Sequence, residues 1–120
     1  MKDISFLKEK GVDVDSSIEL LGDVEMYNEL LGDFVEISIE RMARLDNSKN
    51  NNDMKNYAID VHAIKSDSKY LGFTKLADMA LNHQLKSEDN DIDYINNNYD
   101  ELVNEVDDKI SLIKEYLGMN

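Results

Sequence analysis

His62 is the residue of this sequence whose type and neighbours are best suited to chemistry. It is one of two histidines, and Lys65, Ser66 and Lys69 follow it closely. In a helix, at about 100° per residue, these three side chains lie about 60°, 40° and 20° around the axis from His62. One helix face is therefore expected to present an imidazole together with two ammonium groups and a hydroxyl.

Lysines next to a histidine argue against a metal site or a proton sensor. Positive charges repel a metal ion and oppose protonation of the imidazole. A neutral imidazole is instead a good nucleophile toward phosphorus, and nearby ammonium groups stabilise the negative charge of the phosphoryl group that it accepts. The pattern around His62 therefore indicates a histidine that carries a phosphoryl group.

The distribution of charge agrees with this interpretation. The chain has 26 acidic and 13 basic residues and a net charge of −13. Residues 41 to 75 nevertheless contain seven basic and four acidic side chains, whereas residues 87 to 108 contain nine acidic and no basic ones. We expect a mildly basic end around His62 that meets an acidic partner. The negative net charge argues against nucleic acid or an anionic membrane as partners.

The segment around His62 is predicted to be a helix that ends at Gly72. Apolar and small side chains recur every three or four residues before this glycine and form one stripe for burial. His62 lies one residue off that stripe, so we expect it at the solvent edge, and Gly72 suits the left-handed conformation that closes a helix. The stripe consists of Tyr57, Val61, Ile64, Ser68 and Leu71.

The rest of the chain is also predicted to be helical, because it contains no proline and only five glycines. Two of the predicted stripes include Ile37 and Leu85 as buried positions. Predicted starts are Ser16, which has capping-box spacing to Glu19, then Asp23 as a cap, Thr74 and Ile92. Predicted ends are Gly22, the polar segment Asp46–Asp53, Lys86 before a turn at Ser87–Asp91, and Leu117.

These elements predict an all-α fold, an antiparallel up-down four-helix bundle with a short additional N-terminal helix. The length of 120 residues suits a single domain over residues 1–120. The chain has no cysteine, which excludes disulfides and zinc–thiolate sites. It has neither an apolar run that could cross a bilayer nor a secretion signal, so we expect a cytoplasmic protein.

The segment from His62 to Gly72, HAIKSDSKYLG, resembles the signature of histidine-containing phosphotransfer (HPt) domains of bacterial two-component signalling. That signature is an H-x-x-K-G run with a further glycine ten residues after the histidine, and residues 11–31 and 76–117 also resemble small bacterial members. The resemblance implies that His62 accepts the phosphoryl group, Lys65 stabilises it and Gly72 ends the helix. The family usually has glycine in place of Ser66. Because serine is also small, we expect docking at Ser66 to be retained, with Lys69 facing the partner.

The resemblance further implies a phosphorelay intermediate without chemistry toward nucleotides. His62 would attack the aspartyl phosphate of a receiver domain, and the phosphoryl group would pass later to another receiver. The expected partners are response-regulator receiver domains and a hybrid sensor kinase. Magnesium is expected on the receiver and no cofactor on this chain, which is expected to be a monomer. The sequence has no glycine-rich phosphate loop, so ATP-dependent kinase activity is not expected.

Three alternatives are open on the sequence alone. The first is a helical interaction module in which His62 is incidental. The second is a metal-binding bundle, but neither His62 nor His83 completes a Glu-x-x-His motif. The third is the dimerising helix pair of a sensor kinase, in which an acid and a proline usually follow the histidine, whereas here Ala63 follows. His83 lies beside an imperfect apolar stripe and is expected to have a structural or boundary role.

Overall fold

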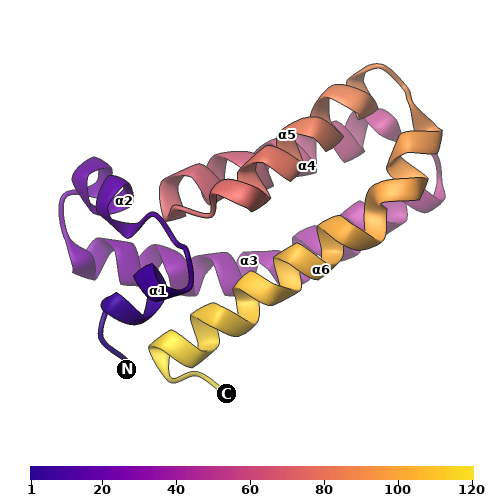
Figure 1. Ribbon diagram of the computed structural model, residues 1–120. Coiled ribbons are helices and arrows are strands. Elements are labelled where there is room, and N and C mark those ends of the chain that lie inside the picture. Colours follow the sequence, from indigo (N-terminus) through magenta and orange to yellow (C-terminus); the bar gives the residue numbers. More distant parts are fainter.

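The computed structural model describes residues 1–120 and is entirely helical, with six helices and no strands (Figure 1). This confirms the prediction of an all-α chain. None of the helices combines the length and the apolar content needed to cross a membrane. The helices are α1 (Ser5–Glu9), α2 (Val14–Leu21), α3 (Val24–Asn50), α4 (Met54–Leu71), α5 (Thr74–Glu88) and α6 (Ile92–Leu117).

Helix α4 has neighbours on several sides. It packs most extensively against α5 and also contacts α3 and α2, while α6 packs against both α5 and α3. Figure 1 shows α4 and α5 side by side, with α3 and α6 running along the opposite side of the molecule and the two short helices at the end that holds both termini. The molecule measures 42 × 28 × 20 Å, so it is elongated along its long helices.

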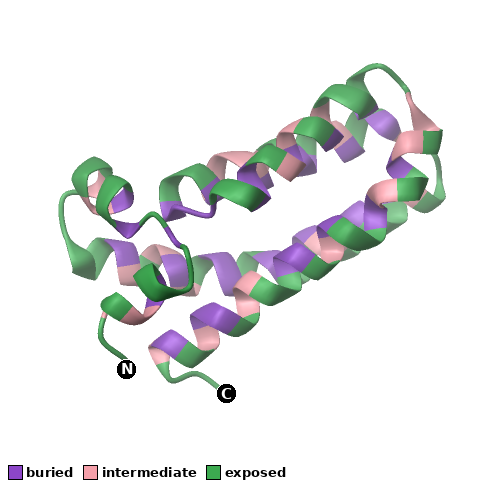
Figure 2. Cartoon of the chain, in the orientation of Figure 1, coloured by how far each residue is buried: buried purple, intermediate pink, exposed green.

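The helices enclose one core of 23 buried apolar residues (Figure 2). All five residues of the predicted α4 stripe, from Tyr57 to Leu71, are buried. In α6, Ile95, Tyr99 and Leu102 are among the buried residues, as the spacing predicts. His62 does not belong to this stripe and is exposed.

The N-terminal region differs from the prediction in two ways. Helix α2 begins at Val14 because the carboxylate of Asp13 accepts a hydrogen bond from the Ser16 N–H at 3.3 Å, so the cap lies three residues before the predicted one. Helix α1 was not expected. It has five residues, too few to show a helical period, and Leu7 is its one buried side chain.

Helix α3 is longer than predicted and runs through most of the polar segment to Asn50. Its periodicity continues with small polar residues, because Ser48 is buried while Asn47 is exposed. The Asn51 N–H then donates to the Asn47 carbonyl at 3.1 Å, and Asn52 takes a positive φ of 53° in the turn. The polar composition predicted a loop here. The helix continues because its side chains still alternate between buried and exposed positions with the helical period. Helix α5 is also longer than predicted, ending at Glu88 rather than at Lys86.

Two apolar side chains predicted to be buried are exposed. Ile37 is 45% exposed, because the buried line of α3 passes through Ser38, whose hydroxyl donates to the Phe34 carbonyl at 2.6 Å. Leu85 is also exposed, because α5 turns His83 and not this leucine toward the core. In both helices a polar residue that has a hydrogen-bond partner, Ser38 or His83, is buried in place of the aliphatic residue that the sequence pattern predicted.

The turn between α4 and α5 is tied to the N-terminal segment. Gly72 ends α4 in the left-handed conformation at φ 81°, and its carbonyl accepts a hydrogen bond from the Asp13 N–H at 3.0 Å. The buried hydroxyl of Tyr27 donates to the adjacent Leu71 carbonyl at 2.8 Å. A Cβ atom at position 72 would collide with the backbone of Asp13. This turn therefore requires glycine for its backbone angle and for the space.

Gly72→Ala is expected to lower the free energy of unfolding by more than about 2 kcal/mol, because the left-handed conformation alone costs an alanine about 1 to 2 kcal/mol and the collision adds to it. Urea denaturation measures the change. Gly32→Ala is the matched control, because position 32 is inside α3 and has open space for a Cβ. This control should be neutral or stabilising by up to about 1 kcal/mol. Equal effects of the two substitutions would contradict the assigned role of the turn.

Candidate functional site

His62 lies on the exposed side of α4, and one ring nitrogen is held by α5. Its Nδ1 is 3.1 Å from Oε1 of Gln84. An amide oxygen can only accept, so Nδ1 carries the proton of this hydrogen bond in the neutral ring. That tautomer leaves the lone pair on Nε2, which has no hydrogen-bond partner in the structure. The nitrogen available as a nucleophile is therefore Nε2.

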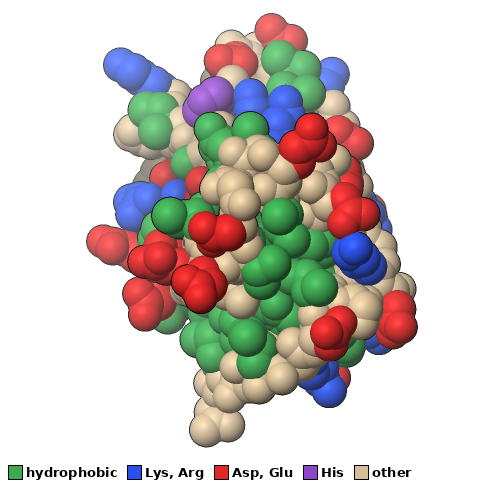
Figure 3. All heavy atoms as spheres, turned by 90° about the vertical axis from the view of Figure 1, so that its left-hand side faces the viewer, with side chains coloured by type: hydrophobic (Ala, Val, Ile, Leu, Met, Phe, Trp, Pro, Cys, Tyr) green, Lys and Arg blue, Asp and Glu red, His purple; other side chains and the backbone are tan.

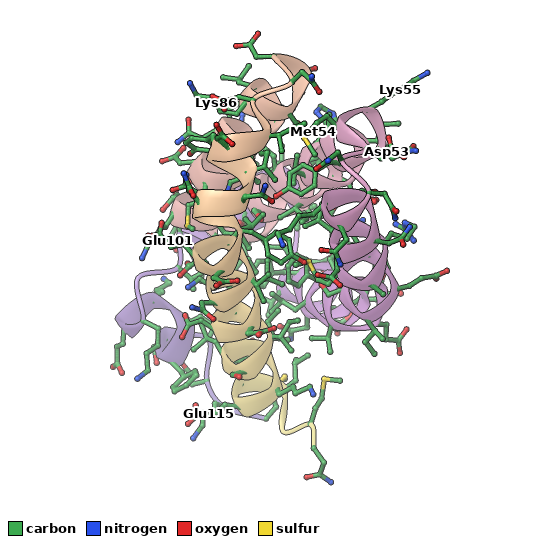
Figure 4. The ribbon with its side chains drawn as sticks, turned by 90° about the vertical axis from the view of Figure 1, so that its right-hand side faces the viewer. Asp53, Met54, Lys55, Lys86, Glu101 and Glu115 are labelled. Atoms are coloured by element: carbon green, nitrogen blue, oxygen red, sulfur yellow. The ribbon has the colours of Figure 1, made fainter.

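A groove between α4 and α5 opens beside the imidazole. It has a volume of about 600 Å³ and is lined by His62 and Gln84 together with residues nearer the loop end of the molecule. Figure 4 shows that end, where Met54 points toward the helices and Lys55 extends away from them. The other lining residues are Ala58, Ile59, Ser87, Glu88 and Asn90.

The predicted basic end is smaller in the structure than in the sequence. Four of the seven basic residues between 41 and 75 already have partners, and the remaining three lie on α4. The engaged groups are Arg41 with Asp67, Arg44 with Asp60, Lys75 with Glu105, and Lys49 over the ring of Tyr99. Lys55, Lys65 and Lys69 form no ion pair.

These three lysines and His62 share one side of α4. Lys55 and Lys69 are each seven residues from His62, which places them about 20° around the axis and about 10.5 Å along it on either side. Lys65 is one turn away, about 4.5 Å along the axis. The sequence predicted a basic end that includes all seven basic residues between positions 41 and 75. In the structure the unpaired positive charges are those of three lysines on the side of α4 that bears His62.

The acidic residues of α4 point toward α3 and are paired there. Asp60 is buried and accepts from Arg44 at 3.0 Å, and Asp67 accepts from Arg41 at 2.8 Å. The hydrogen bond with Asp60 raises the pKa of Arg44 above its ordinary value, and so does the charge of that carboxylate. These pairs neutralise both carboxylates of α4, so the lysines of this helix are not cancelled by acids of the same helix.

The structure places the five predicted site residues on or at the end of one helix. Lys65 and Ser66 are partly exposed, and Lys69 is exposed. Gly72 is at the C-terminal cap, at the opposite end from Lys55. No group of three or more His, Asp or Glu side chains is arranged so that it could hold a metal ion.

His83 belongs to the core and not to this site. It is 2% exposed, its Nδ1 accepts from the Tyr57 hydroxyl at 2.8 Å, and the ring of Tyr94 meets it edge-on with centroids 5.6 Å apart. Burial lowers the pKa of His83 to about 4, because the charged form loses its hydration there, while a hydrogen bond to the backbone of Asn98 opposes the shift. Sequence analysis expected a structural or boundary position, and the structure shows the structural one.

Gln84, the hydrogen-bond partner of the His62 imidazole, was not predicted from the sequence. A signal was present but not decisive. Gln84 directly follows His83 on a helix predicted to pack beside α4, yet the register between two antiparallel helices depends on the length of their connection and on which side chains are buried. The structure shows both: the connection is the turn at Gly72, and the buried side chain is that of His83.

Comparison of the chain with family models, with curated proteins and with solved structures finds no match in any of the three.

Gln84→Ala is expected to change the tautomer of His62 without changing the fold, because Gln84 is the sole hydrogen-bond partner of the ring and lies at the surface. When the ring of the parent protein is neutral, nitrogen NMR should report the Nδ1–H form. In the variant the population should move toward Nε2–H, the more common tautomer of free histidine. Gln84→Glu is the control, since a carboxylate also accepts from Nδ1 and should keep the first tautomer. Identical spectra for all three proteins would contradict the contact.

The buried state of His83 predicts that stability falls when pH is lowered from about 6.5 to about 4. The pKa of His83 is about 4 in the folded protein, against an ordinary value of 6.5. Between these values the unfolded chain binds a proton that the folded chain refuses, so the free energy of unfolding decreases as pH falls, by about 3 kcal/mol at most.

Urea denaturation of the parent protein and of His83→Gln over this pH range measures the difference. The variant should lose the part of the slope due to this group, whereas His62→Gln should retain it, because His62 is exposed. An NMR titration of the His83 ring in the parent protein provides a second measurement that does not depend on the variant folding. A titration midpoint near 6.5 would show that the ring is not buried as described.

Proposed function

We propose that this protein is a phosphorelay intermediate that accepts a phosphoryl group on Nε2 of His62 from the aspartyl phosphate of a receiver domain and passes it to another receiver. The observation that carries the proposal is the hydrogen bond between Nδ1 and Gln84, which leaves the other nitrogen unprotonated and without a hydrogen-bond partner. An exposed imidazole with one orienting acceptor and unpaired lysines beside it is suited to nucleophilic attack on phosphorus.

The transfer step needs no proton from the chain. The lone pair of Nε2 forms the N–P bond while the bond between phosphorus and the aspartyl oxygen breaks, and the carboxylate of the receiver leaves with the electron pair. The imidazole then bears a positive charge, which the Gln84 oxygen stabilises through Nδ1–H. In the second transfer the same bond is broken in favour of a new aspartate. Gln84 thus acts by positioning and charge stabilisation in both directions.

Lys65 is the proposed counter-charge for the phosphoryl group. It is one turn from His62, has a flexible side chain and is not engaged in an ion pair, so its ammonium can follow the arriving group. Lys69 lies about 10.5 Å along the helix, beyond direct contact with a phosphoryl group on the ring, and we assign it to the acidic surface of the partner. Ser66 lies between Lys65 and Lys69 in the sequence, and its small side chain leaves space for a partner to approach Nε2.

The architecture proposed with this function is the antiparallel up-down four-helix bundle of α3 to α6, with α1 and α2 as additions at one end. Support comes from the packing of each of these helices against two of the others. The partners are response-regulator receiver domains and a hybrid sensor kinase that bears one, with magnesium in the receiver's acidic site. The protein acts as a monomer in the cytoplasm, where such relays operate.

His62→Gln is expected to abolish phosphoryl acceptance and to leave the fold intact, because the side chain is exposed and its hydrogen bond is with Gln84 at the surface. The measurement is incubation with a panel of receiver domains that have been phosphorylated by a small acyl phosphate such as acetyl phosphate. Label on the parent chain that is stable to base and labile to acid indicates phosphohistidine. Circular dichroism checks that the variant is folded.

Two controls accompany this experiment. Lys114→Gln removes a positive charge from α6, away from the line of lysines on α4, and should accept the phosphoryl group like the parent. ATP with magnesium alone should leave the parent chain unlabelled, since the chain has no nucleotide-binding motif. If no receiver labels the parent protein while some receiver still binds it, the chain is an interaction module and the proposal is wrong.

A further inference from the structure

Ser66 lies one helical turn after His62 on the same side of α4. Residues at this spacing have Cβ atoms about 5–6 Å apart, and Ser66 is partly exposed while His62 is exposed. The other serine of this helix, Ser68, is 0% exposed and belongs to the buried stripe. Ser66 is therefore the serine of α4 that neighbours the imidazole at the surface.

The two turns that flank His62 differ in chemistry. Ala58 and Ile59 lie one turn before it and have aliphatic side chains, whereas Lys65 and Ser66 lie one turn after it and have side chains that donate hydrogen bonds. Figure 3 shows a histidine next to basic side chains on one face of the molecule. Within one turn of His62, a phosphoryl group on the ring therefore finds donor side chains of α4 only on the C-terminal side.

A phosphoryl group calls for more than one donor. It carries a charge of about −1.5 to −2 and three acceptor oxygens, and Lys65 offers a single ammonium group. Because Nδ1 is held by Gln84 at 3.1 Å, the phosphoryl group is placed on Nε2. Its oxygens lie two bonds beyond that nitrogen, which extends the reach of the side chain toward the neighbouring turn. A hydroxyl one turn away is suited to bind one of these oxygens.

The hydroxyl of a helical serine can exchange one acceptor for another. In this chain the hydroxyls of Ser17 and Ser38 donate to carbonyls of the preceding turn, those of Asp13 at 3.2 Å and Phe34 at 2.6 Å. Rotation about one bond turns such a hydroxyl from a carbonyl toward a group beyond it. Hydrogen bonds to a charged acceptor are about twice as strong as those between neutral groups. A phosphoryl oxygen is therefore the favoured acceptor for Ser66 once His62 is phosphorylated.

We infer that the hydroxyl of Ser66 donates a hydrogen bond to a phosphoryl oxygen on His62 and thereby prolongs the lifetime of phosphohistidine. Lys65 balances the charge of the group, and Ser66 adds a directional contact to one of its oxygens. The inference rests on the proposed function and adds to it a residue that touches the transferred group. A glycine at position 66 could not make this contact, because it has no side-chain donor.

Hydrolysis is the reaction that ends this lifetime in the absence of a partner. A water oxygen forms a bond to phosphorus while the N–P bond breaks. The imidazole leaves as a neutral ring with the electron pair on Nε2 and its proton on Nδ1, and both protons of the water stay with the released phosphate. In the loose transition state the negative charge on the phosphoryl oxygens falls as the bond to the ring lengthens. A donor to these oxygens therefore stabilises phosphohistidine more than the transition state and slows hydrolysis.

The test labels His62 without a receiver, by means of phosphoramidate, a small molecule that phosphorylates histidine. After the reagent is removed, phosphorus NMR follows the loss of phosphohistidine. Ser66→Ala and Ser66→Gly remove the hydroxyl and should each shorten the half-life about fivefold, whereas Ser66→Thr keeps a hydroxyl and should retain most of it. Alanine and glycine differ in size and in helix propensity, so a loss common to both is due to the hydroxyl.

Ser111→Ala is the matched control, because Ser111 is an exposed helical serine of α6, and its half-life should equal that of the parent. If Ser66→Ala and Ser66→Gly decay like the parent, or if Ser66→Thr decays as fast as they do, the inference is overturned and the proposed function stands. Acid-stable label on Ser66 would show that the hydroxyl accepts the group, which also overturns the inference.

The same experiment separates the contact from the relay. If phosphoramidate leaves His62 unlabelled, Nε2 is not the nucleophile described, and the inference and the proposed function fail together. If the half-life depends on the Ser66 hydroxyl while no receiver labels the parent protein, the inference is supported and the proposed function is wrong.

Discussion

The enclosure of α4 is the constraint on which the rest of the structure depends. Helices α5 and α3 cover two of its sides, and the buried stripe from Tyr57 to Leu71 fills the space between them. A helix held in this way leaves the side chains outside its buried stripe to solvent, and the register of the buried residues decides which ones these are. His62 is therefore exposed on a rigid element, because its helix can neither rotate nor shift without opening the core.

The electrostatics of the exposed line follow from pairs formed underneath it. In an acidic protein the default surface is negative, and α4 itself contains Asp60 and Asp67. Both carboxylates form ion pairs with arginines of α3, at 3.0 and 2.8 Å, so their negative charges are balanced within the contact between the two helices. Each of these ion pairs is partly buried, and their consequence for the surface is that Lys55, Lys65 and Lys69 are the charged side chains of α4 without an ion-pair partner.

The sequence predicted those features that depend on local periodicity, and missed those that depend on register. The last helix and the buried stripe of α4 could be read from the spacing of apolar residues, and Gly72 could be recognised as a helix end. The length of α3 was misjudged because a polar run resembles a loop in composition, whereas burial of Ser48 continues the helical period. Gln84 was missed because no pattern within one helix reveals which residue of a neighbouring helix faces it.

Two adjacent residues of α5 connect the stability of the fold to the geometry of the site. His83 points into the core and binds Tyr57, while Gln84 points to the edge and binds His62, so both contacts reach the same helix five residues apart. The buried contact is the stronger constraint, because an unsatisfied imidazole or hydroxyl in the core is costly, whereas the exposed contact competes with water. The register of α5 on α4 is therefore fixed by the buried pair, and the exposed amide is positioned by it. A histidine of the core in this way determines which nitrogen of His62 is left without a hydrogen-bond partner.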